Sequence, residues 1–229
     1  MLDNKNNRKN IIFTFAIILF IIIIDQSLKI WVKSNMSIGE NSFLHWNWNI
    51  KWFQLYFIEN NGMAFGMELP GKLGKYILTI FRLIIITFMV FYIIKLSKKP
   101  VPKILLISFA MITAGALGNL IDSMFYGLIF SPSHFYSSIE SVSPAHLTAI
   151  GKGYAGFLQG KVVDMLYFPL FTIHFPHNWP LVGGKIFKFF EPIFNIADSS
   201  ITIGVILLLL FSKKWNNIAE ANKNVNEIN

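Results

Sequence analysis

The sequence predicts an all-α membrane protein with four transmembrane helices and a small β element outside the cytoplasm. Three observations support this fold class. Of the 229 residues, 54% are hydrophobic and only 14% are charged, whereas a soluble domain contains about 25% charged residues. Four apolar segments are long enough to cross a bilayer. A loop between two of them alternates aromatic and polar residues, which is the period of a half-buried strand.

The four predicted spans cover residues of about 11–32, 76–94, 104–121 and 193–212. Lysines and an arginine precede the first span, as in a secretory signal peptide, but no small-x-small cleavage site follows it. We therefore expect a retained anchor. The sequence contains no internal repeat and no low-complexity tract, so residues 1–229 are predicted to form a single integral membrane domain.

The distribution of lysine and arginine predicts the orientation of these spans. Residues 1–10, 95–103 and 213–229 carry ten basic residues in 36 positions, whereas the loops 33–75 and 123–192 carry eight in 113. Cytoplasmic segments near span ends are enriched in basic residues. Both termini are therefore predicted to be cytoplasmic, and both long loops to lie outside. The net charge of +8 is then a topology signal, and no nucleic-acid partner is expected.

The first outward loop contains the predicted β element. Residues 46–52 alternate aromatic or apolar side chains with polar ones, and residues 53–57 could continue that strand. Asn60 and Gly62 follow as turn residues. We interpret the segment as a small sheet on the bilayer surface, compatible with a platform that holds substrate. In such a platform Gly62 and Gly66 would let the backbone approach the substrate closely.

Four of the five aspartates lie in or against apolar sequence: Asp25, Asp122, Asp164 and Asp198. An ionisable side chain at membrane depth costs about 2.5 to 3.5 kcal/mol, so their presence needs a reason. At 1.5 Å per helical residue, Asp25 lies about 21 Å along the first span, and Asp198 lies about 8 Å below the outer end of the fourth. Asp122 follows the outer end of the third span. We therefore predict one outer layer of carboxylates, which Asp164 could join from its loop.

A pair of buried carboxylates suits peptide hydrolysis. Two carboxylates that share one site cannot easily both ionise, so one proton is held between them. The ionised member takes a proton from water as it attacks the scissile carbonyl, and the protonated member donates to the carbonyl oxygen. Composition and spacing alone leave two other roles open, namely contacts that tie helices together and a transport path across the membrane.

Five short motifs occur along the chain in a specific order. They are DQSLK at 25–29, NNGMAFG at 60–66, GALGNLID at 115–122, VVD at 162–164 and FNIAD at 194–198. Their order, and their placement on four spans with both ends inside, resembles lipoprotein signal peptidase, also called signal peptidase II. The resemblance extends over residues from about 11 to 212.

By this resemblance, Asp164 and Asp198 are the catalytic aspartates of an intramembrane aspartic endopeptidase in the bacterial inner membrane, with its active site near the outer face. The family removes signal peptides from diacylglyceryl-modified prolipoproteins by cleaving before the lipidated cysteine. It implies no cofactor and no metal, and globomycin-type cyclic peptides are expected to occupy the same site. Supporting or substrate-binding roles would fall on Asp25, Asn60, Gly62, Asn119, Asp122 and Asn195.

The chain departs from the family in two respects. Arginine usually follows the aspartate of the third motif, whereas Ser123 stands here. Arg82, about seven residues into the second span, is a candidate replacement. The outward loop 123–192 is also longer than the family leads us to expect. These departures concern how substrate fits and what covers it, while the expected fold and chemistry are unchanged.

Other mechanisms are weighed against this hypothesis. A serine–lysine peptidase would use Ser27 and Lys29, but residues two apart face different sides of a helix, and Lys29 is expected to extend to the outer interface. His174 and His177 are more typical of a surface turn than of a metal site, and no His-Glu-x-x-His segment occurs. The chain has no cysteine nucleophile. The remaining alternative is a proton-coupled small transporter, since membrane carboxylates also form proton relays.

Overall fold

The computed structural model describes residues 2–41, 52–62, 71–137, 143–181 and 183–211. The chain divides into two compact units. Unit 1 comprises residues 1–26, 71–121 and 196–229, and unit 2 comprises residues 27–70 and 122–195. That residues 1–229 form a single integral membrane domain stays a prediction.

Unit 1 is built from apolar helices. They are α1 (Leu2–Asn35), whose first 25 residues belong to this unit, α3 (Gly71–Ser97), α4 (Lys103–Ile121) and a shorter helix, Ile196–Phe211. Three helical stretches, Asn6–Asn35, Leu73–Ser97 and Lys103–Ile129, are long and apolar enough to cross a membrane. This confirms a membrane protein with three of the predicted spans.

The fourth predicted span differs from its expected bounds. The helix begins at Ile196 rather than at residue 193, because Ile193 and Phe194 form a short strand that pairs with another. Its 16 described residues would extend about 24 Å, against a hydrocarbon core of about 30 Å. A count of four spans therefore stays a prediction. Asp198 consequently lies in the first turn of the helix rather than five residues into it, and its depth in the membrane stays a prediction.

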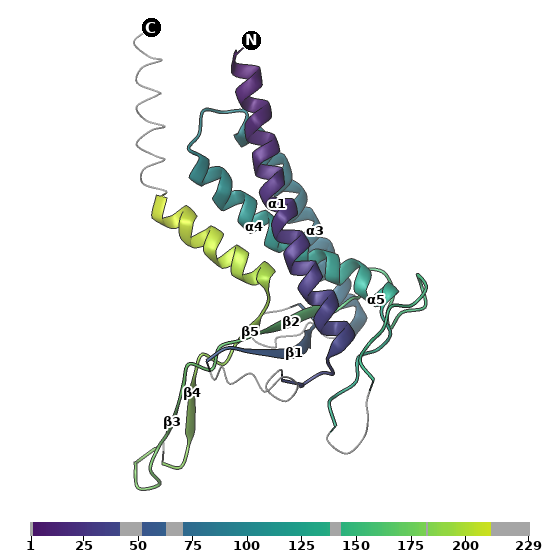
Figure 1. The fold of residues 1–229 in the computed structure, drawn as a ribbon, viewed down its shortest axis with the longest axis vertical. Helices are drawn as coiled ribbons and strands as arrows, with labels where there is room; N and C mark the ends of the chain where they lie inside the picture. The colour runs from purple at the N-terminus through teal and green to yellow at the C-terminus, as the bar shows by residue number, and fades with distance from the viewer. Residues whose placement is uncertain (1, 42–51, 63–70, 138–142, 182, 212–229) are drawn as a thin grey trace. The chain divides into compact units, whose positions relative to one another are not determined.

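Small residues allow the helices of unit 1 to pack closely. Ile18, Ile93 and Ala114 form a buried cluster that joins α1, α3 and α4, which run side by side in Figure 1. A Cβ atom on Gly204 would lie 2.8 Å from the carbonyl oxygen of Ser108, so the helix Ile196–Phe211 meets α4 backbone to backbone. Such interfaces are typical of membrane helices, whose association depends on close van der Waals packing.

Unit 2 contains an antiparallel sheet of three strands in the order β1, β2, β5 (Figure 1). The strands are β1 (Gln54–Asn60), β2 (Val162–Tyr167) and β5 (Ile193–Phe194). One side of the sheet packs on a buried cluster that includes Val32, Phe57, Tyr126, Phe130 and Met165. The predicted strand is confirmed for residues 54–57, and residues 46–51 and Gly66 lie outside the described part of the chain.

Three further elements complete unit 2. A single π-helical turn, η2 (Asp122–Tyr126), follows α4 directly and leads into the short α5 (Gly127–Ile129). Such turns within helices are rare and often occur at functional sites. The connection from β2 to β5 forms a second, two-stranded sheet of β3 (Phe171–His174) and β4 (Ile186–Phe189).

Candidate active site

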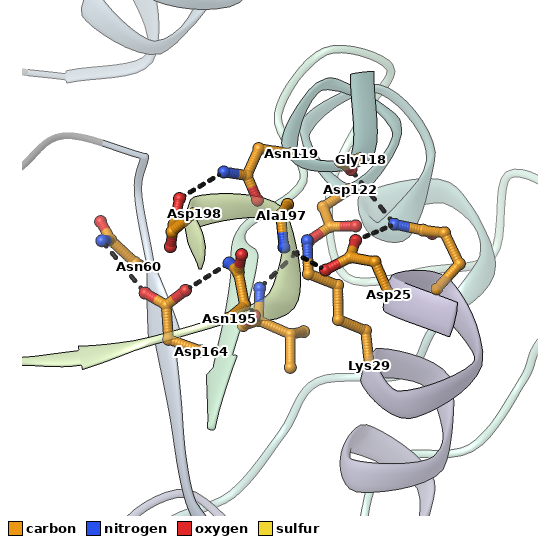
Figure 2. Close-up of polar contacts among 12 residues, drawn as sticks. Asp25, Lys29, Asn60, Gly118, Asn119, Asp122, Asp164, Asn195, Ala197 and Asp198 are labelled. Carbon is orange, nitrogen blue, oxygen red and sulfur yellow. Dashed lines mark hydrogen bonds and ion pairs between the residues drawn. The ribbon is translucent and has the colours of Figure 1, made fainter. Parts of the chain in front are cut away.

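Asp164 lies in the central strand of the unit 2 sheet and is only 2% exposed. Ile58 of β1 is its register partner. Asn60, two residues further along β1, therefore lies diagonally opposite on the same face. The amide of Asn60 donates to one carboxylate oxygen at 3.3 Å, and the amide of Asn195 donates to the other at 2.7 Å (Figure 2). Both oxygens of Asp164 thus accept a hydrogen bond from an asparagine.

The Asn60 side chain is oriented by the turn that follows it. The backbone N–H of Gly62 donates to the Asn60 side-chain oxygen at 2.8 Å, which directs the NH₂ group toward Asp164. Gly62 adopts a φ of 97°, a conformation that is costly for residues with a Cβ atom. The predicted importance of Gly62 therefore has a local structural reason, and its proposed contact with substrate stays a prediction.

Asn195 follows β5 directly and is fully buried. Its NH₂ group contacts two acceptors, the Asp164 carboxylate and, at 3.3 Å, the carbonyl oxygen of Val163. The short pairing of β5 with β2 places Asn195 beside the strand that carries Asp164. A buried amide with several partners is held in one orientation, so Asn195 is a rigid support for Asp164.

Asp122 forms an ion pair with Lys29 of α1. The Lys29 ammonium lies 2.8 Å from the Asp122 carboxylate, and both side chains are 0% exposed. The same carboxylate oxygen accepts the backbone N–H of Val163 at 3.3 Å, so Asp122 supports β2 one residue before Asp164. The expectation that Lys29 extends to the outer interface is wrong. Its side chain is held by Asp122, which also argues against a base paired with Ser27.

A second charged cluster in unit 2 was not predicted from the sequence. The buried Glu59 carboxylate pairs with Lys33 and accepts hydrogen bonds from Ser133 at 2.7 Å and Lys161 at 3.2 Å. Burial alone would raise the pKa of Glu59, but Lys33, Ser133 and Lys161 together hold it below its usual value. Lys33 lies four residues after Lys29, on the same helix face. This four-residue spacing is the feature of the sequence that could have indicated that both lysines point toward the interior of the protein.

The aromatic surroundings of Lys33 complete this cluster. Its ammonium lies 5.9, 5.3 and 5.0 Å from the ring centres of Phe57, Phe130 and Tyr154. Cations are attracted to aromatic faces within about 6 Å. Burial raises the pKa of Tyr154, whose hydroxyl accepts the backbone N–H of Lys161 at 2.6 Å. The cluster therefore ties the end of α1 to β1 at the residue before Asn60.

Asp198 belongs to unit 1, in the first turn of the helix Ile196–Phe211. The NH₂ group of Asn119, near the end of α4, donates to Asp198 at 2.7 Å (Figure 2). Asp198 is partly exposed, unlike the buried Asp164. A carboxylate is favoured near a helix N-terminus by the helix dipole. The Asn119 amide thus holds the Asp198 carboxylate, and a supporting role of Asn119 in catalysis stays a prediction.

Asp25 of α1 supports the same helix start. Its carboxylate accepts the backbone N–H of Ala197 at 2.9 Å, one of the N–H groups that a helix leaves without an internal partner. Gln26 donates to Asp25 and to the carbonyl oxygen of Gly118, both at 3.1 Å. A Cβ on Gly118 would lie 2.7 Å from the Asp25 carboxylate. Asp25 therefore fixes the residue directly before Asp198.

The predicted site residues thus form two groups, one in each unit. Unit 2 brings together Asp164, Asn60, Gly62, Asn195 and Asp122, whereas unit 1 brings together Asp198, Asn119 and Asp25. Three of the four changes of unit along the chain, after Gln26, Ile121 and Asn195, lie within a few residues of these side chains in sequence. The pairing of Asp164 with Asp198 stays a prediction. Among the described residues, no group of three or more histidine or acidic side chains is arranged to hold a metal.

Comparisons with known proteins identify similar sequences. The sequence profile of the family described as Signal peptidase (SPase) II matches residues 17–214. A lipoprotein signal peptidase from Porphyromonas gingivalis is 43% identical over 196 residues, which cover 85% of this chain and 80% of the relative. A lipoprotein signal peptidase from Amoebophilus asiaticus is 36% identical over 197 residues, which cover 86% and 75%.

Solved structures extend the similarity to the fold. A bacterial membrane enzyme determined by the in meso method at 2.3 Å resolution covers 88% of this chain and 88% of its own, with a TM-score of 0.53 at 24% identity. A second such structure, at 1.9 Å resolution, has a TM-score of 0.51 at 26% identity and covers 86% of this chain and 90% of its own. The helices and the small sheet therefore follow the fold of a known bacterial membrane enzyme.

Proposed function

This chain belongs to the signal peptidase II family, and on that premise we propose that it removes signal peptides from prolipoproteins as an aspartic endopeptidase. The protein is proposed to reside in the bacterial inner membrane and to cleave the prolipoprotein before its diacylglyceryl-modified cysteine. The observation that carries the aspartic mechanism is that asparagine side chains hold both Asp164 and Asp198. The proton-coupled transporter has no support from the family or the relatives.

Chain connectivity supports the pairing of the two carboxylates. Asn195 donates to Asp164 at 2.7 Å, and Asp198 follows Asn195 by only three residues. Three residues extend at most about 11 Å. The backbone of Asp198 is therefore tethered near the amide that holds Asp164, however the two units are arranged. A shared water molecule between the two carboxylates is consistent with that tether.

Asparagine side chains donate hydrogen bonds to both carboxylates. Each oxygen of Asp164 accepts an asparagine N–H, and Asp198 accepts one from Asn119. We propose that the two carboxyl groups share one proton. The ionised member takes a proton from water as the water oxygen bonds to the scissile carbonyl carbon, while the protonated member donates its proton to the carbonyl oxygen. When the tetrahedral intermediate collapses, the leaving amine receives a proton from the pair and the C–N bond breaks.

The remaining residues position this pair. Asn60, Asn195 and Asp122 hold β2 and Asp164, and Asp25 and Asn119 hold the helix start that carries Asp198. No metal or cofactor enters the mechanism. Both termini are proposed to be cytoplasmic and the catalytic pair to lie near the outer face of the membrane, in contact with lipid. Globomycin-type cyclic peptides should compete with the prolipoprotein for this site.

The test is cleavage by the purified protein of a diacylglyceryl-modified prolipoprotein, with the released peptide identified by mass. Asp164→Asn and Asp198→Asn should each abolish release, because an amide cannot accept the proton of water. Glu191→Gln, which removes an exposed carboxylate outside the site, is the matched control and should retain full activity. Undiminished cleavage by either aspartate variant would refute the mechanism, and cleavage of the unlipidated precursor at an equal rate would refute the substrate assignment.

A further inference from the structure

The hairpin of β3 and β4 has no role in the chemistry proposed above. It forms the connection between β2, which carries Asp164, and β5, which precedes Asn195. Phe171, Ile173, Phe187 and Phe189 are all between 42% and 49% exposed. At its turn, Trp179 is 53% and Leu181 94% exposed. An exposed apolar area of this kind marks a contact surface for lipid or for another protein.

The strand register gathers these residues on one face. Phe171 pairs with Phe189, and Ile173 pairs with Phe187. Because side chains alternate between the faces of a strand, all four share a face. The Phe171 and Phe189 rings stack with centres 4.6 Å apart and planes 4° apart, so the apolar side chains form a continuous surface. We call these four residues the apolar hairpin face.

Thr172 and His174 occupy the opposite side of the ribbon. Thr172 lies between Phe171 and Ile173 in the sequence of β3, and His174 follows Ile173. Both residues are exposed. Apolar and polar residues therefore alternate along β3 with a period of two, although Ile186 of β4, the register partner of His174, adds one exposed apolar side chain to the opposite face. A two-stranded ribbon is marginally stable in water unless one face packs against something. An exposed apolar face of this kind is expected to be covered by a partner.

Chain connectivity indicates that this partner is lipid. Phe190, directly after β4, precedes the apolar helix Ile196–Phe211 by six residues, a reach of at most about 20 Å. The hairpin base is thus tethered to an apolar helix that is proposed to be the fourth membrane span. Aromatic side chains such as Trp179 favour the boundary between hydrocarbon and water.

We propose that the β3–β4 hairpin is a membrane-anchoring element whose apolar face lies in the interfacial region of the bilayer. The occupant of this face is phospholipid. An anchored hairpin restrains β2 and β5 at both of its ends, and so holds the strand of Asp164 and the support of Asn195 at a fixed depth. This role goes beyond peptide cleavage and does not depend on the catalytic assignment.

The absence of cysteine in the sequence permits a direct test with single-cysteine variants. Ile173→Cys and Thr172→Cys are matched, because they are adjacent, both exposed and on opposite faces. Each full-length variant is labelled with an environment-sensitive fluorophore and reconstituted in vesicles of phosphatidylethanolamine and phosphatidylglycerol. Quenching is measured with spin-labelled phospholipid and, separately, with aqueous iodide. Phe88→Cys, on an exposed position of α3, provides the reference for a label in hydrocarbon.

The label at Ile173 should be quenched several-fold more by spin-labelled phospholipid than the label at Thr172, and iodide should show the reverse order. Equal iodide quenching of both labels would overturn the proposal, because the face would then lie in water. Protection of the Ile173 label from both quenchers would also overturn it, because a protein partner would then cover the face. The same measurement on an Asp164→Asn background should give the same pattern. It therefore separates failure of the anchor from failure of the proposed activity.

Discussion

Replacement of Lys29 by methionine would remove the cation that faces the buried Asp122 carboxylate. At 2.8 Å and 0% exposure, two unit charges attract by about 6 kcal/mol at an effective dielectric constant of 20. Measured costs of breaking a buried pair from one side are about 3 to 5 kcal/mol, because the remaining charge stays buried. We therefore expect the free energy of unfolding to fall by about 3 to 5 kcal/mol.

The assay is thermal unfolding of the purified protein in detergent, combined with the cleavage rate. For a chain of this size, each kcal/mol corresponds to about 2 to 4 °C, so the Tm of Lys29→Met should fall by about 6 to 20 °C. Asp122→Asn should be destabilised similarly because it leaves Lys29 without its countercharge. Cleavage should slow in both, since Asp122 also holds the backbone of Val163 beside Asp164.

The double variant tests whether the pair acts as a unit. Lys29→Met combined with Asp122→Asn buries no charge at either position, so its loss of stability should be smaller than the sum of the two single losses by at least about 2 kcal/mol. Lys152→Met, at an exposed position, is the matched control and should change stability by less than about 0.5 kcal/mol. Strictly additive single losses would refute the reasoning, because they would mean that the two charges do not interact.

Three other predictions follow from contacts of the site. Gly62→Val should slow cleavage, because valine is strained at a φ of 97° and the Asn60 amide would lose its fixed orientation. The helical circular dichroism should be unchanged. An unaltered cleavage rate would show that Gly62 has no role in the site. The pKa of Glu59 is lowered in the folded protein, so its contribution to stability is present above its unfolded pKa of about 4.3 and is lost as pH falls through the lower folded value. Glu59→Gln should therefore reduce the dependence of the free energy of unfolding on pH in the acid range. An unchanged slope in that range would contradict this prediction. Asp25→Leu should cost about 1 to 2 kcal/mol, as for loss of a helix cap, whereas Asp25→Asn keeps an acceptor for Ala197 and should cost less in thermal unfolding; equal losses would argue against the cap.

The helices of unit 1 could be predicted because each is a long apolar run, whose meaning is independent of the rest of the chain. The start of the last helix could not, because it is set by Ile193 and Phe194 pairing with β2. A strand of two residues leaves no periodic pattern in a sequence. The motif residues could be selected as candidates because each motif combines polar side chains with an apolar background, and their roles stay predictions.

The contacts of those residues could not be predicted, because their partners lie in distant segments of the sequence. Lys29 and Asp122 are far apart in sequence, as are Lys33 and Glu59, and no local pattern links them. Sequence reasoning placed Lys29 at the interface because an isolated lysine in a span usually extends there. The structure shows the alternative, in which a buried carboxylate satisfies the charge. Local signals thus indicated candidate residues, whereas tertiary contacts decide which partners those residues have.

The division of the chain also has a consequence for biosynthesis. Neither unit is a continuous stretch of sequence, since unit 1 ends with residues 196–229 and unit 2 with Asn195. A ribosome therefore releases Asn195, which supports Asp164, and the helix that carries Asp198 only after the other described segments of both units. Until those residues emerge, Asp164 lacks the amide of Asn195 and Asp25 lacks the helix start that it caps. The contacts that hold Asp164 and Asp25 are therefore complete only after the residues from 195 onward have been synthesised.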